Sequence, residues 1–212
     1  MNNNSNPLNE LEASRKQESS SGKSMSIIAL LGEDDIGKTT TLSYLVVLLL
    51  GGGKLNKDIK NAFDKRFKKA NGLYKDSHHI IHYKNSEGKE ACIYVSTNGD
   101  TWTVVENNFE FFYGLCDGRT KVHEFEYSKM DFVKRAPLKK DNPPCPDLCI
   151  SPANLNNGAI HAEHYYLSKT RFDWKSQLWI RKKELKDDNS DAFAEDNEIM
   201  ANLIIKEIDR MI

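Results

Sequence analysis

Eight consecutive residues, from Gly32 to Thr39, place glycine, lysine and threonine in a spacing that suits a phosphate group. They read Gly-Glu-Asp-Asp-Ile-Gly-Lys-Thr and fit the pattern G-x-x-x-x-G-K-[ST]. Glycine lets successive backbone N–H groups turn toward one anion. Lys38 would reach the β- and γ-phosphates of a nucleotide, Thr39 would ligate Mg²⁺ through its hydroxyl, and Thr40 would touch the α-phosphate. The residues predicted to form this site are Gly32, Glu33, Asp34, Asp35, Ile36, Gly37, Lys38, Thr39 and Thr40.

The segments on either side are of the kind needed to hold such a loop in place. Residues 25–31 are a short apolar run, typical of a buried parallel strand. Residues 40–50 are apolar over a length that suits a buried helix, and Gly51-Gly52-Gly53 ends them. A helix that starts at the loop adds its N-terminal N–H groups and positive dipole end to the same anion. The context therefore predicts a strand, a phosphate loop and a helix in succession.

At these residues the chain resembles the P-loop NTPase superfamily and, more loosely, its small single-domain members, which include nucleotide kinases. The resemblance covers only Gly32 to Thr40. It implies a three-layer α/β fold, with a mostly parallel sheet between helices, that binds ATP and Mg²⁺. The loop lacks the early second lysine of deviant-loop partition ATPases, and no transporter-ATPase signature is present. An N-K-x-D motif for guanine is also absent, so ATP is favoured over GTP.

Three acids, Glu33, Asp34 and Asp35, occupy the variable positions of the loop. Their side chains can point into solvent while the backbone holds the phosphate, although they should weaken phosphate binding at low salt. One of them could instead help to hold a cation or meet a basic partner. Solvated loop acids are the simpler interpretation.

A second candidate carboxylate, Asp100, follows a predicted β-hairpin. We expect strands at residues 78–83 and 91–95, joined by a turn at 85–89, and a helix at residues 101–113. Asp100 could cap that helix. It also stands just beyond the carboxyl end of a strand, where α/β folds bind ligands and where an acid can orient Mg²⁺ or its water. We therefore predict Lys38 and Asp100 as catalytic residues, and Thr39 and Asp100 as metal ligands.

The remaining segments complete an α/β pattern. We expect helices at 56–71, 158–168 and 191–212, and strands at 147–151 and 177–180, with Pro152 ending the former strand. The helix at 56–71 is strongly basic, which predicts a solvated face or, as a sharper alternative, a site for an acidic or phosphate-bearing substrate. Together these segments predict a mostly parallel sheet with helices on both faces and a β-hairpin at one edge.

Length and composition suit one domain over residues 25–212, with 116–144 as a lid or insertion and 1–24 as a disordered tail. The net charge of −1 gives no global field to attract nucleic acid, which is not indicated. The longest apolar stretch is too short to span a bilayer, so no membrane association is expected. Four cysteines are too few for a disulfide framework, and we expect reduced thiols and a cytoplasmic protein.

The favoured function is Mg²⁺-dependent binding of ATP, followed by hydrolysis or by phosphoryl transfer to an unidentified acceptor. Asn98 and Asn154, at the strand ends, are candidates for the acceptor pocket, and Arg119, Arg135 or Arg171 could supply a second cation. The alternative is a non-catalytic module in which the bound nucleotide controls a surface for a partner protein. A structural protein with a fortuitous loop is the third class, and it predicts no stabilisation by nucleotide.

Overall fold

The computed structural model of the chain describes residues 24–116, 145–156, 158–168, 173–184 and 190–212. Its strands are β1 (Ser24–Gly32), β2 (His78–Lys84), β3 (Glu90–Ser96), β4 (Leu148–Asn154) and β5 (Asp173–Arg181). Its helices are α2 (Lys38–Leu50), α3 (Lys57–Phe67), α4 (Trp102–Cys116), α5 (Ala159–Ser168) and α6 (Ser190–Met211). Each predicted helix and strand is present, with ends that differ by a few residues. The predicted tail at 1–24 and insertion at 116–144 lie outside the described residues, except for Ser24 and Cys116.

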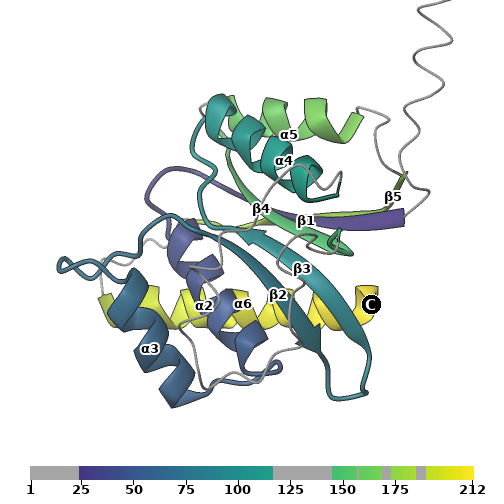
Figure 1. Cartoon of the computed structure of the whole chain (residues 1–212). Helices are drawn as coiled ribbons and strands as arrows, with labels where there is room; N and C mark the ends of the chain where they lie inside the picture. Colours follow the sequence, from purple (N-terminus) through teal and green to yellow (C-terminus); the bar gives the residue numbers. More distant parts are fainter. Residues whose placement is uncertain (1–23, 117–144, 157, 169–172, 185–189) are drawn as a thin grey trace, which may run out of the picture.

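The strands form one sheet in the order β2-β3-β4-β1-β5. β1 runs parallel to both β4 and β5, and β3 runs parallel to β4. β2 is antiparallel to β3 and lies at the edge, so the predicted edge hairpin is confirmed. Helices α4 and α5 cover one face of the sheet, and α2, α3 and α6 cover the other (Figure 1). The predicted α/β class and mostly parallel sheet are thus confirmed.

β4 extends further than the sequence predicts. Pro152 does not end the strand, which continues to Asn154 and pairs along its whole length with β1. The ladder between β4 and β3 covers only Leu148 to Ile150. Pro152 lies beyond that ladder, so on that side its missing N–H breaks no strand pairing. The extension carries Asn154 to the same level as Gly32, its partner on β1.

The hydrophobic core has two halves, one on each face of the sheet. Alternate residues of a strand point to opposite faces, and β1 is buried almost throughout. Ile28 and Leu30 pack into the cluster that includes residues of α2, α3 and α6. Ile27 and Ala29 pack into the cluster that includes residues of α4 and α5. β1 is therefore fixed from both sides, which holds the loop after it in a defined place.

Helix α2 is apolar on nearly every side because the sheet, α3 and α6 all contact it. With 13 residues it is a buried core helix. In the part of the chain that the structure describes, none of the helices combines the length and the apolar character needed to cross a membrane.

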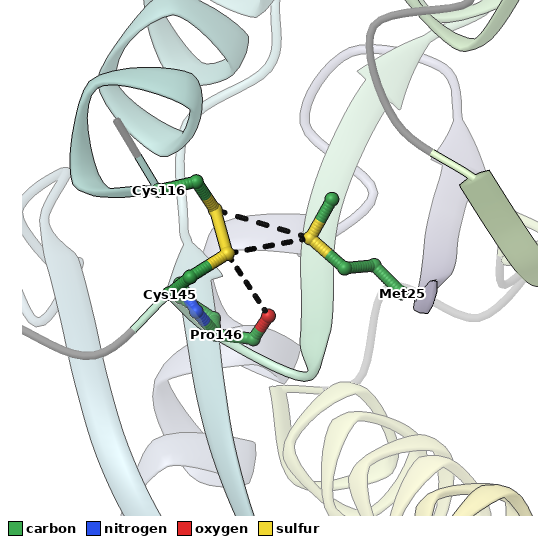
Figure 2. The surroundings of a disulfide bond; sticks show 4 residues. All are labelled: Met25, Cys116, Cys145 and Pro146. Carbon is green, nitrogen blue, oxygen red and sulfur yellow. Dashed lines mark hydrogen bonds between the residues drawn. A yellow bond between two sulfur atoms is a disulfide. The ribbon is translucent and has the colours of Figure 1, made fainter. Parts of the chain in front are cut away.

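Two of the four cysteines are paired. Cys116, the last residue of α4, forms a disulfide with Cys145, three residues before β4 (Figure 2). The Met25 sulfur lies 3.6 Å from Cys145 Sγ and 3.9 Å from Cys116 Sγ. The expectation of reduced thiols is wrong for this pair, because the end of α4 and the segment before β4 bring the two Cα atoms within 4.1 Å of each other. Cys92 and Cys149 are buried thiols within strands.

Candidate functional site

The predicted loop lies at the point where the chain changes faces of the sheet. The carboxyl ends of β1 and β4 are adjacent, with Gly32 opposite Asn154. The helices that follow these two strands, α2 and α5, cover opposite faces (Figure 1). In open parallel sheets, such a reversal leaves a crevice at the carboxyl ends of the two strands, where ligands bind.

Gly37 is the position in the loop where the backbone favours glycine. Its φ is 85°, in the left-handed region, and it is the N-cap of α2. At Gly32 a Cβ would lie 2.1 Å from Cδ1 of Ile36, so the end of that side chain would have to move. Asp35 also adopts a left-handed φ of 57°, which is uncommon for a residue with a side chain. The loop is therefore a tightly turned backbone and not an extended connection.

The N-terminus of α2 has no side-chain cap. The N–H of Thr41 makes the first intrahelical bond, to Gly37 O at 2.8 Å. The preceding N–H groups, of Lys38, Thr39 and Thr40, have no acceptor within the helix. Uncapped N–H groups at the positive end of a helix dipole favour an anion.

Lys38 is folded back over the loop. Its side chain is buried, and Nζ donates hydrogen bonds to Gly32 O at 3.1 Å and Glu33 O at 2.5 Å. Burial lowers the pKa of Lys38, and the carboxylates of Asp100, Asp34 and Asp35 oppose that shift. The ammonium group therefore has carbonyl partners on the loop and carboxylates around it.

Thr39 is hydrogen-bonded to the connection that follows β3. Its hydroxyl donates to Thr97 O at 3.1 Å. Thr97 is buried and is held by Ser77, whose N–H donates to Thr97 Oγ1 at 2.8 Å. The Ser77 hydroxyl lies 2.7 Å from Nε2 of the buried His79. The predicted metal-ligating hydroxyl is thus fixed to both strands of the hairpin.

Asp100 lies within electrostatic reach of Lys38. Its side chain is exposed. The alternative role of helix cap belongs to Thr101 instead, whose hydroxyl accepts from the Val104 N–H at 3.4 Å. Helix α4 begins one residue later than predicted, so Asp100 is displaced from the capping position.

The three loop acids are exposed, in agreement with the simpler interpretation. Asp34 is in addition held by the side chain of Asn154, whose Nδ2 donates to Asp34 Oδ1. Asn154 was one of two candidates for an acceptor pocket, and here it supports the loop. The side-chain oxygen of the other candidate, Asn98, is buried without a hydrogen-bond partner among the described residues.

Helix α6 contacts the loop and the start of α2 through Asn197. No role for this residue was predicted from the sequence. Asn197 is fully buried and accepts a hydrogen bond from the Thr41 hydroxyl at 2.7 Å. Its Nδ2 donates to Phe193 O at 2.6 Å. A Cβ on Gly37 would lie 2.6 Å from Asn197 Oδ1. The sequence offered one signal for this contact: Asn197 is a polar amide within the apolar stripe of the closing helix.

A cavity of about 220 Å³ opens next to the loop, at the end of β5. Lys182 forms part of its wall. Two contacts hold Lys182 in place: its backbone N–H donates to Leu31 O at 2.8 Å, and its buried ammonium group pairs with Asp196. Sequence patterns gave no sign of this cavity, which depends on the pairing of β5 with β1. The lining residues are Glu33, Ile36, Leu155, Arg181, Lys182, Lys183 and Glu184.

The metal site expected around Thr39 and Asp100 would use one hydroxyl and one carboxylate. Among the residues that the structure describes, there is no group of three or more histidine, cysteine, aspartate or glutamate residues suited to a metal ion. Mg²⁺ commonly needs only one or two protein ligands, because water and substrate phosphates complete its shell. The donors present thus fit Mg²⁺ that arrives with a nucleotide.

Arg119, Arg135 and Arg171, the predicted second cations, lie outside the described residues.

Comparison of the chain with protein-family models, with curated proteins and with solved structures gave no match. Inferences about its function therefore depend on the residues of this chain alone.

Proposed function

We propose that the protein is a P-loop NTPase-like domain that binds ATP with Mg²⁺ on Gly32 to Thr40, and hydrolyses it or transfers its γ-phosphoryl group to an acceptor. The observation that carries the proposal is the uncapped N-terminus of α2, which follows a left-handed glycine beside the adjacent carboxyl ends of β1 and β4. Converging N–H groups of this kind bind phosphates in many proteins.

The side chains around the loop have matching chemistry. Lys38 can exchange its two carbonyl partners for phosphate oxygens, which would relieve a buried charge held by neutral groups. Thr39 can likewise exchange the Thr97 carbonyl for Mg²⁺. When bound, Mg²⁺ would neutralise charge on the phosphates, and Asp100 would orient the ion or its water.

The cavity beside the loop offers room for the rest of the nucleotide. Ile36 and Leu155 give it an apolar wall, Arg181, Lys182 and Lys183 give it cations, and Glu33 and Glu184 add carboxylates. We propose that the nucleoside part lies here, on the opposite side of the loop from Asp100.

A thermal-shift titration with Mg²⁺ and ATP tests this proposal, together with an assay for ADP release. We expect ATP to raise the melting temperature of the wild-type protein. Lys38→Ala should remove that rise, or abolish ADP release, without unfolding the domain. Lys206→Ala, a change of an exposed lysine on α6, is the control. If Lys38→Ala keeps both the full rise and full ADP release, the loop has no part in nucleotide chemistry.

A further inference from the structure

The segment from Lys54 to Lys75 concentrates positive charge on one side of the molecule. It contains eight lysine and arginine residues against two aspartates, a net charge of +6 in a chain whose total is −1. The remaining residues are therefore net acidic. Helix α3, the centre of this segment, lies on the outside of the layer that also holds α2 and α6 (Figure 1).

The fold leaves most of this charge without a carboxylate. One aspartate, Asp64, is occupied by Lys60 at 2.5 Å and by the Tyr74 hydroxyl at 2.6 Å. The other, Asp58, stands in the first turn of α3. Six exposed lysines of this segment form no salt bridge within the described part of the chain. Five of them lie in α3 or after it, and we call these five the basic face: Lys57, Lys65, Lys68, Lys69 and Lys75.

Helix stability does not account for this pattern. Lysine in the last turn of a helix interacts favourably with its dipole, which suits Lys65. Lys57 stands at the opposite end, where the dipole opposes it, and Lys69 and Lys75 lie beyond the helix. Like charges three or four residues apart cost about 0.2–0.5 kcal/mol per pair in a helix. An uncompensated cluster of this kind is expected where an anionic partner binds.

We propose that the basic face is a docking surface for a short acidic segment of a partner protein. Two exposed leucines flank it, Leu55 at 44% and Leu73 at 57%, and offer apolar contacts that protein partners use. The aromatic residues of the segment, Phe63, Phe67 and Tyr74, are buried and cannot stack on bases. A long nucleic acid would also meet the acidic remainder of the chain, whereas a short acidic segment would not.

The basic face adjoins the candidate site without belonging to it. Asp76, directly after Lys75, lies close enough to Lys69 and Asp100 to interact with both charges. The next residue, Ser77, is hydrogen-bonded to Thr97 and so to the connection that holds Thr39. A partner on this surface would therefore sit beside the segment that holds Thr39.

The test measures binding of a fluorescent glutamate-rich peptide with a leucine near each end to the full chain, with no nucleotide present. We expect salt-sensitive binding that weakens about tenfold in the double variant Lys65→Glu, Lys68→Glu. The matched control is Lys84→Glu, Lys89→Glu, which reverses two exposed lysines that pair with Glu90 and Glu87 in the hairpin. The control should bind nearly as the wild type does. If the first variant does not fold, Lys65→Gln, Lys68→Gln replaces it.

Three results would overturn the proposal: no peptide binding, equal loss in both double variants, or tighter binding to duplex DNA or anionic lipid vesicles than to the peptide. Since the assay contains no ATP, it succeeds or fails independently of nucleotide binding.

Discussion

Asp100 is the carboxylate whose role the surrounding residues define most sharply. Thr101 caps α4, so Asp100 is released from the structural role that the sequence also allowed. We predict that Asp100→Asn will strongly reduce the Mg²⁺-dependent release of ADP. The free energy of unfolding should change by less than about 0.5 kcal/mol, because the side chain is exposed.

Kinetics at varied Mg²⁺ and urea unfolding provide the two measurements for Asp100. Asp58→Asn, which changes an exposed carboxylate in the first turn of α3, is the matched control and should leave turnover intact. Parallel loss of stability and turnover in Asp100→Asn would contradict a role in metal binding.

Glu163 on α5 is a buried carboxyl group outside the candidate site. It is fully buried, and neither oxygen has a hydrogen-bond partner among the described residues. Burial raises its pKa from 4.5 to about 8, and the nearby Ser151 hydroxyl opposes this only in part. The folded protein therefore binds a proton that the unfolded chain releases between these values. Its stabilising contribution is complete below pH 4.5 and is lost as the pH rises toward about 8.

We predict that Glu163→Gln will flatten this pH dependence. Above about pH 8 the variant should be more stable than the wild type by roughly 2 kcal/mol or more, and near pH 5 the two should be similar. Urea unfolding across this range checks the prediction, with the exposed Glu87→Gln as control. A wild-type stability that stays constant or rises over this interval, relative to Glu163→Gln, would refute it.

At the scale of elements, the N-terminal half of α6 and the start of α2 act as one support for the loop. Asn197→Ala would leave the Thr41 hydroxyl without its acceptor and open space beneath Gly37. We expect a loss of about 1–3 kcal/mol in the free energy of unfolding. A loss of ATP-dependent stabilisation should accompany it, because the loop is no longer supported.

Asn202→Ala provides a close control for Asn197. Asn202 lies on the same helix and also donates to the carbonyl four residues earlier, at 2.9 Å, but on the exposed side. If ATP stabilises Asn197→Ala as much as it stabilises Asn202→Ala, then α6 does not position the loop.

The strands and helices could be predicted from the sequence because each carries its own signal. β1 and α2 are apolar runs separated by glycines, and the hairpin has a turn between two alternating segments. Partners between distant elements carry no such signal. The bond from Thr39 to Thr97 joins residues 58 apart, and the bond from Thr41 to Asn197 joins residues 156 apart. These contacts, and the cavity at β5, follow from the order of the strands, which no local pattern specifies.

At the scale of the whole molecule, the disulfide and the loop lie at opposite ends of the two interior strands β1 and β4. Cys116 and Cys145 stand where α4 ends and β4 begins, whereas the loop follows the carboxyl end of β1. The bridge links residues 29 apart, and closure of a loop of that length stabilises a fold by roughly 3.5 kcal/mol. We predict that reduction will lower the free energy of unfolding by about this amount and leave ATP affinity unchanged.

Urea unfolding with and without reductant measures this effect. The variant Cys116→Ser, Cys145→Ser should resemble the reduced wild type and should not respond to reductant. Equal stability of the oxidised and reduced wild-type protein would contradict a stabilising bridge. Loss of ATP affinity on reduction would show that the two ends of these strands are coupled.

A crystal structure with Mg²⁺ and a nonhydrolysable ATP analogue tests the central claim most directly. The account predicts that the backbone N–H groups of the loop and of the first turn of α2 surround the phosphates, with Lys38 turned from Gly32 O and Glu33 O toward them. An analogue bound elsewhere, with Lys38 still on those two carbonyls, would contradict it.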